Sequence, residues 1–319
     1  MKKIFLIIIL FAINLTAFSQ VGKLMREAKN TTDLNQQIKL YDQVLALEPK
    51  NLDAYFLRGL AKNDLDDFHG AIVDYSKVIL SKPDADSYFN RGNSRYSLGD
   101  FESAKDDFLN AYKLDPYFVD ALYSLAHTQY DLEDYQSALK SINTFIDLVS
   151  EQARGYNLRA LIFAQANNYK SAISNYSMAI LVEPSTETYL NRGVYYLNIN
   201  YYKNADSDFK TVLRIDKTNS FAYFYRGATG LLLGKYPNAV FDFKKAIEYD
   251  AFDFDAMLGL AMTYYKANDF ENAKLYYAKA AQVVSPNEPI NSVNAFENSY
   301  WFVNQYYFFA NMYNSLAKL

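Results

Sequence analysis

Apolar residues recur at spacings of three, four and seven along most of the chain, from about residue 52 to about residue 287. This spacing places them on one face of an α-helix, so it predicts amphipathic helices rather than strands. Short polar pairs separate successive helices, and an aromatic residue follows each pair; they are Gly99-Asp100, Glu133-Asp134, Gly234-Lys235 and Asn268-Asp269. The pattern therefore predicts a series of helical hairpins.

The hairpins repeat every 33 or 34 residues. A small residue marks the middle of each first helix: Gly59, Gly92, Ala126, Ala160, Gly193, Gly227 and Ala261. An alanine follows twelve residues later in each unit: Ala71, Ala104, Ala138, Ala172, Ala205, Ala239 and Ala273. Four residues further comes an aromatic residue or isoleucine: Tyr75, Phe108, Ile142, Tyr176, Phe209, Phe243 and Tyr277. Small facing residues let two helices approach closely, so each unit is expected to be one packed hairpin.

The segment from Tyr88 to Pro116, YFNRGNSRYSLGDFESAKDDFLNAYKLDP, resembles the tetratricopeptide repeat nearly throughout. That family places an aromatic residue at repeat position 4, glycine or alanine at 8, alanine at 20, an aromatic residue at 24, a small residue at 27 and proline at 32. The resemblance implies an all-α, right-handed superhelical solenoid of tandem helix-turn-helix repeats. It also implies that the first helices line a concave groove that binds a protein or peptide.

The resemblance covers nearly all of the chain after its first nineteen residues. We expect a degenerate repeat at 20–51 and a C-terminal capping helix at 288–319. Between them we expect seven repeats, at 52–84, 85–118, 119–152, 153–185, 186–219, 220–253 and 254–287.

The first nineteen residues are typical of a secretory signal peptide. Lys2 and Lys3 precede an apolar core at 4–13, and Ala17-Phe18-Ser19 offers small residues for cleavage before Gln20. We therefore expect export to the periplasm or the extracellular space of a bacterium. The alternative is an uncleaved membrane anchor, although the stretch is shorter than the roughly 20 apolar residues that a span needs.

Arginine occupies repeat position 7, where the family usually has leucine, and its presence correlates with aspartate at position 23. The pairs are Arg58 with Asp74, Arg91 with Asp107, Arg192 with Asp208 and Arg226 with Asp242. Arg159 faces the amide Asn175, and the units with Leu125 and Leu260 carry Ser141 and Tyr276 instead of aspartate. We expect an Arg–Asp bridge within each hairpin; the alternative is a row of arginines that reads an acidic ligand.

The composition of the chain argues against several kinds of functional site. With 32 basic and 36 acidic residues there is no basic patch to predict nucleic-acid binding. The chain has no cysteine and only two histidines, which lie 58 residues apart, so we expect no metal site. The phosphate-loop-like GLLLGKY at 230–236 coincides with a hairpin turn. We expect neither catalysis nor a cofactor.

Positions 5, 9 and 12 of the first helices are expected to form the stripe on the concave side, and aspartates at position 13 add negative charge beside it. The binding candidates are Phe56, Phe89, Asn93, Tyr96, Tyr123, His127, Tyr130 and Asp131. Asp64, Phe224, Met262 and Tyr265 occupy corresponding positions. Aromatic residues at position 5 argue against a carboxylate clamp. The aromatic rings either stiffen the packing of neighbouring first helices or anchor an extended or helical segment of a partner.

The segment from Ala295 to Leu319 is unusually aromatic and has only a narrow polar stripe. A terminal cap normally presents a polar outer face, so one side of this helix could cap the last repeat while the other binds a second copy or a partner. The function expected is a non-enzymatic scaffold of the bacterial cell envelope. The alternatives are a glycan-binding helical-repeat protein, or a non-catalytic subunit of a secretion or assembly complex docked through this segment.

Overall fold

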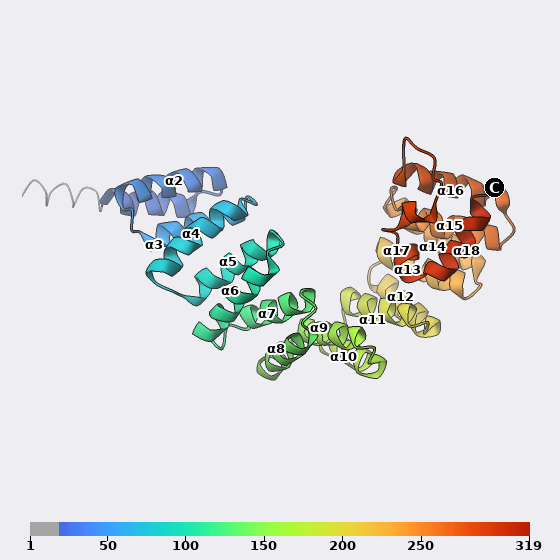
Figure 1. Cartoon of the computed structure of the whole chain (residues 1–319), viewed down its shortest axis with the longest axis horizontal. Helices are drawn as coiled ribbons and strands as arrows, with labels where there is room; N and C mark the ends of the chain where they lie inside the picture. Colours follow the sequence, from blue (N-terminus) through green and yellow to red (C-terminus); the bar gives the residue numbers. More distant parts are fainter. Residues whose placement is uncertain (1–18) are drawn as a thin grey trace, which may run out of the picture. The chain divides into compact units, whose positions relative to one another are not determined.

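The computed structural model describes residues 19–319, so nearly all of the expected signal peptide lies outside the described residues. The regular elements of this part of the chain are all helices, and they form two compact units (Figure 1). Unit 1 ends at Glu151. It contains a helix at 19–30, α2 (Leu34–Leu47), α3 (Leu52–Asn63), α4 (Phe68–Ser81), α5 (Ala85–Ser97), α6 (Phe101–Leu114), α7 (Val119–Asp131) and α8 (Tyr135–Leu148).

Unit 2 spans Gln152–Leu319. It contains α9 (Ala153–Gln165), α10 (Tyr169–Val182), α11 (Thr186–Asn198), α12 (Tyr202–Ile215), α13 (Ser220–Leu232), α14 (Tyr236–Tyr249), α15 (Phe254–Lys266), α16 (Phe270–Val284), the 3₁₀ turn η1 (Val293–Phe296), α17 (Tyr300–Asn304) and α18 (Tyr306–Leu316). The predicted fold class, tandem helix-turn-helix repeats with a helical C-terminus, is confirmed.

Each turn between the two helices of a hairpin from α3 to α16 contains one left-handed residue, and in most of these turns the next residue caps the second helix with its side chain. In the turn between α5 and α6, Gly99 has φ of 77°, and the side chain of Asp100 then accepts from the backbone N–H of Ser103. Glu133 takes the same conformation, with φ of 60°, ahead of the N-cap Asp134. A left-handed residue reverses the chain, and a capping carboxylate satisfies N–H groups that the new helix leaves unpaired.

Glycine at position 8 lets the two helices of a hairpin pack closely. A Cβ on Gly92 would lie 2.8 Å from the Phe108 ring, and one on Gly193 would lie 2.6 Å from the Phe209 ring. Both rings are buried, so the missing side chain of the first helix makes room for the aromatic residue of the second. This contact explains why small and aromatic residues alternate at fixed spacing in the sequence.

The C-terminal segment differs from the single capping helix that we expected. Gln305, with φ of −134° and ψ of 38°, ends α17 and begins α18. The interruption allows two rings to be buried in different places: Trp301 packs against Phe243, and Phe309 packs against Phe296. The expectation of one continuous helix was therefore wrong.

Candidate functional site

The four expected Arg–Asp pairs all lie within their own hairpins. Arg192 of α11 donates from Nε and Nη2 to the two carboxylate oxygens of Asp208 on α12, both at 2.8 Å. The side chain of Asp208 is 6% exposed and that of Arg192 is 20% exposed. The same two-bond geometry joins the remaining pairs, Arg58 with Asp74, Arg91 with Asp107, and Arg226 with Asp242. Arg159 instead donates to the side-chain oxygen of Asn175 at 2.7 Å.

Three of these arginines also contact the second helix of the preceding hairpin. The Nη1 groups of Arg91 and Arg192 donate to the hydroxyls of Ser76 and Ser177, at 2.9 and 3.0 Å. Arg58 Nη1 lies 2.5 Å from the carboxylate of Asp42. The arginine therefore links neighbouring hairpins as well as the two helices of its own.

The ring of a tyrosine three residues earlier in the sequence lies against each of these guanidinium groups. The guanidinium of Arg91 lies 5.5 Å from the centroid of the Tyr88 ring, and Arg226 lies 5.6 Å from that of Tyr223. This cation–π contact is readable in the sequence as the spacing Y-x-x-R-G, although we did not predict it. Each of the four paired guanidinium groups thus donates from Nε and Nη2 to the aspartate of its own hairpin and lies against a tyrosine ring, which favours the structural interpretation of the arginine row.

The structure brings three of the binding candidates together between α5 and α7 in unit 1. The Tyr96 hydroxyl donates to Asp131 Oδ2 at 2.5 Å and lies 3.2 Å from Nδ1 of His127. Nδ1 of His127 also lies 3.1 Å from Asp131 Oδ2. The side chains of His127 and Asp131 are 39% and 24% exposed, so this cluster is within reach of a ligand.

The phenol of Tyr96 stays protonated over the physiological pH range. Burial raises its pKa, and the hydrogen bond to Asp131 raises it further. The hydroxyl consequently acts as a donor to Asp131, and the carboxylate keeps lone pairs that can accept from a second donor.

A hollow of about 270 Å³ adjoins this cluster. Its lining includes Asn93 and Tyr96 of α5 and Tyr123 and His127 of α7. Tyr123 also packs its ring against Phe145 at 5.4 Å. Four of the eight candidates therefore share one hollow, with Asp131 at hydrogen-bonding distance of two of them.

The other candidates lie elsewhere. Phe89 packs between Phe108 and Phe118, at centroid distances of 5.8 and 4.8 Å, so it supports hairpin packing. Tyr130 packs against Tyr135. Phe56 lines a separate cavity of about 570 Å³, which also contains charged residues from the helix at 19–30 and from α3.

Two candidates of unit 2 are buried, so their prediction as surface groove residues was wrong. Met262 is fully buried, and Phe224 is 6% exposed because Tyr300 and Trp301 of the C-terminal segment cover it. The sequence pattern places them on the groove side of their helices, but it does not show that a later segment occupies that side.

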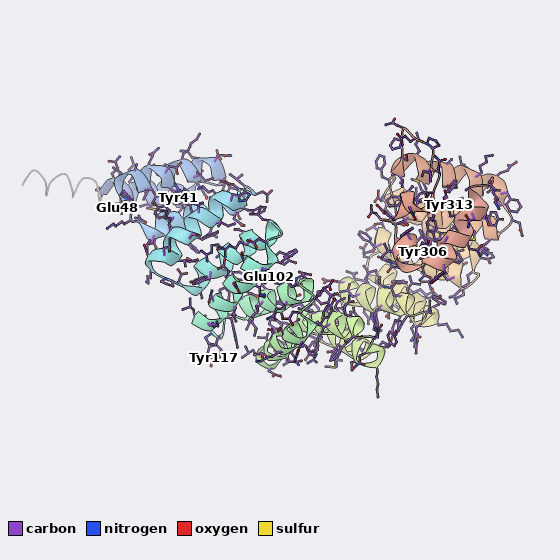
Figure 2. All side chains as sticks on the ribbon, in the orientation of Figure 1. Tyr41, Glu48, Glu102, Tyr117, Tyr306 and Tyr313 are labelled. Carbon is purple, nitrogen blue, oxygen red and sulfur yellow. The ribbon has the colours of Figure 1, made fainter. Side chains whose placement is uncertain are left out.

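The C-terminal segment buries some aromatic residues and exposes others. Figure 2 labels Tyr306 and Tyr313 of this segment. Tyr313 is 8% exposed, whereas Tyr306 and Tyr307 are 42% and 90% exposed. Val303 is also 66% exposed. Docking of a second copy or of a partner on this surface stays a prediction.

Unit 2 also contains a cavity of about 680 Å³ that we did not predict. It lies between α9, α10, α11 and the beginning of α13, and carboxamide and aromatic side chains dominate its lining. Asn157 was the available signal, because position 5 of the repeat belongs to the stripe expected to face the groove.

The part of the chain that the structure describes holds no group of three or more histidine, cysteine, aspartate or glutamate side chains suited to a metal ion. Across residues 19–319, no helix is both long enough and apolar enough to span a bilayer.

Comparisons with known proteins give one family. Models of the tetratricopeptide repeat match residues 85–118, 123–185, 186–219 and 222–289, which together make up more than half of the chain. Human tetratricopeptide repeat protein 6 is 26% identical over 37% of the chain, and the match spans 23% of that protein's own length.

Solved structures show the same fold. A tetratricopeptide repeat protein from Parabacteroides merdae has a TM-score of 0.62, with 19% identity over 81% of this chain and 99% of its own. Yeast Tom70 has a TM-score of 0.60, with 16% identity over 89% of this chain and 59% of its own. The repeat models, the regular hairpins and these likenesses agree: the chain belongs to the tetratricopeptide repeat family.

Proposed function

We propose that the chain is a non-enzymatic scaffold or adaptor of the bacterial cell envelope, which binds a protein or peptide through the first-helix surface of its repeats. The export signal expected in residues 1–19 supports the location. The family supports the binding of a protein partner in general.

The observation that carries the proposal is the cluster of Tyr96, His127 and Asp131 beside the hollow of unit 1. Tyr96 and His127 supply ring surface, and Asp131 supplies a hydrogen-bond acceptor. These residues lie on α5 and α7, the first helices of two successive hairpins, and the side chains of His127 and Asp131 are partly exposed. An apolar or aromatic side chain of the partner would enter the hollow. A backbone N–H or another donor of the partner would bind the carboxylate of Asp131.

The arginines are not proposed as ligand-binding groups. Each carboxylate partner is nearly inaccessible, so a bound acidic ligand would have to displace a buried bidentate pair. The hollow of unit 1 is the better candidate, because it offers ring surface and a partly exposed hydrogen-bond acceptor.

A peptide-display selection on the full chain, followed by calorimetry with the enriched peptide, tests the proposal. His127→Leu should weaken binding by roughly thirtyfold, the effect of losing one anchor of about 2 kcal/mol. His69→Leu is the matched control, because His69 is the other histidine and lies exposed on α4 outside the hollow. Its affinity should equal that of the wild type.

Phe89 is unsuitable for this test, since its ring supports the packing of the hairpin and its removal would weaken the fold. Circular dichroism should show that both histidine variants retain the wild-type helicity. The proposal fails if no enriched peptide binds in solution, or if His127→Leu binds the peptide as tightly as His69→Leu.

A further inference from the structure

The cavity of unit 2 opens where two successive hairpins pack loosely. Helix α10 packs less closely against α11 than α12 packs against α13. Side chains of α9, α10, α11 and α13 surround the resulting space of about 680 Å³, a size typical of small-molecule sites. The proposed peptide site of unit 1 shares no residue with it.

The lining of this cavity carries no ionisable acid or base other than tyrosine. Five carboxamide side chains line it: Asn157, Gln165, Asn167, Asn191 and Asn198. A carboxamide both donates and accepts hydrogen bonds, as does the tyrosine hydroxyl. About one residue in five of the whole chain is charged, so a wall without Lys, Arg, Asp, Glu or His is a distinct chemical environment.

Two residues that line this cavity each have a buried polar atom with no hydrogen-bond partner among the described residues. These atoms are the hydroxyl of Tyr195 and the side-chain oxygen Oδ1 of Asn157. Tyr195 as a whole is only 8% exposed. Buried polar groups are normally paired, so each such atom calls for an explanation, and a ligand that supplies the missing partners is a direct one.

Aromatic rings lie beside these polar groups. Tyr195 packs against Tyr176 at 5.3 Å between ring centroids. Tyr169 and Phe221 also line the cavity, and they are 51% and 65% exposed. The cavity therefore offers flat apolar faces together with paired donors and acceptors.

We propose that this cavity binds an uncharged sugar unit of a neutral oligosaccharide. A charged ligand would lose its hydration without gaining a counter-charge, so the lining selects against it. A sugar ring presents hydroxyl groups along its edge, which both donate and accept, and apolar C–H groups on its face, which pack against aromatic rings.

A neutral peptide segment is the competing ligand, but the observations favour the sugar. Backbone N–H groups only donate and backbone C=O groups only accept. These groups recur at a fixed spacing along an extended peptide, so a peptide would be matched best by carboxamides arranged in a row along its length. The clustered hydroxyl groups of a sugar can pair with both the donor and the acceptor of a carboxamide. The carboxamides here surround one cavity and do not form a row along one helix.

The test is a calorimetric and saturation-transfer NMR titration of the full chain with maltotriose, cellotriose, N-acetylated chitotriose and lactose, each to about 10 mM. Trigalacturonate serves as the acidic counterpart. At least one neutral sugar should bind with a Kd in the millimolar range or tighter, and trigalacturonate should not bind. Tyr195→Phe should weaken binding roughly two- to tenfold and Asn157→Leu about tenfold or more, because each removes hydrogen-bonding groups of the wall.

Tyr75→Phe is the matched control. The Tyr75 hydroxyl is also buried and unpaired, but it belongs to α4 and does not line this cavity. Both Tyr→Phe variants should melt at or above the wild-type temperature without ligand, because each removes an unsatisfied hydroxyl. Only Tyr195→Phe should alter sugar binding.

Three results would overturn the proposal: no binding of any neutral sugar, equal binding of trigalacturonate, or unchanged affinity in both Tyr195→Phe and Asn157→Leu. Binding of an uncharged peptide that depends on Tyr195, without sugar binding, would assign the cavity to a peptide instead. The peptide test of unit 1 depends on His127, which does not line this cavity. A negative result in the peptide test therefore does not affect the sugar test.

Discussion

At the residue scale, the arginine that precedes glycine joins the two helices of its own hairpin through an aspartate of the second helix. The sequence alone indicated the partner, because arginine at position 7 accompanies aspartate at position 23 and leucine accompanies Ser141 or Tyr276. The contacts to Ser76 and Ser177 could not be predicted in the same way. They depend on how one hairpin packs against the preceding one, which the periodicity within a hairpin does not specify.

Arg192 and Asp208 give the cleanest test of the bridge, because Arg95 and Lys62 provide second cations to Asp107 and Asp74. Arg192→Leu or Asp208→Ser alone should each lower the free energy of unfolding by about 3–5 kcal/mol, since each leaves a buried charge without its partner. The double variant should lose much less than the sum, because it adopts the Leu125 and Ser141 combination that the chain already uses. Urea unfolding of the four proteins measures this coupling.

Lys210→Gln is a suitable surface control, because Lys210 is 60% exposed and pairs only with Asp206 on its own helix. It should change the free energy of unfolding by less than about 1 kcal/mol. Strict additivity of the Arg192 and Asp208 substitutions would show that the bridge contributes nothing to the hairpin.

At the element scale, the sequence predicted the repeat helices and a helical C-terminus, but not the break at Gln305 within the C-terminal segment. The left-handed turn positions include Glu133 and Asn268 as well as glycine, and the sequence marked them as polar pairs. Trp301, by contrast, sits where Gly259 leaves room: a Cβ there would lie 2.8 Å from Trp301 Cζ2. That fit joins residues more than forty positions apart, and no local pattern reveals it.

The attachment of this segment depends on a buried acid. Both carboxylate oxygens of Asp255 on α15 accept from the backbone N–H of Tyr300, at 2.9 and 3.1 Å, and the Trp301 indole N–H donates to the Asp255 backbone oxygen. Burial is the main cause that raises the pKa of Asp255 to about 7; the hydrogen bond from the Tyr300 N–H opposes this rise, and the neighbouring charge of Asp253 adds to it. The phenols of Tyr225 and Tyr300 also face this carboxyl group.

Stability should therefore fall as the pH rises from about 4 to about 7. In this range the folded state holds a proton that an unfolded aspartate, with a pKa near 3.8, has released. The slope from Asp255 should be at most about 1.4 kcal/mol per pH unit. Trp301 is the only tryptophan of the chain, so its fluorescence during urea unfolding at several pH values reports on this segment directly.

Asp255→Asn supplies the comparison. The amide keeps an oxygen that accepts from Tyr300 but does not ionise, so the pH dependence between 4 and 7 should flatten. If the wild type and Asp255→Asn show the same pH slope, another group controls the attachment of the C-terminal segment.

At the scale of the whole molecule, the sequence predicted the repeat architecture because every repeat restates the same small and aromatic positions. The candidate site was predictable only in part. Tyr96, His127 and Asp131 follow from their register on two first helices, whereas the burial of Phe224 depends on a distant segment. The cavity of unit 2 likewise reflects looser packing between two hairpins, which their matching sequences do not show.

The central claim is that the chain binds a peptide on the first helices of unit 1. Hydrogen–deuterium exchange of the full chain, with and without the selected peptide, tests it most directly, because a bound segment slows local opening of the helices that it covers. Protection should be greatest in α5 and α7, and at a peptide concentration near the wild-type Kd it should be much weaker in His127→Leu. Protection confined to α17 and α18, or none in α5 and α7, would contradict the account.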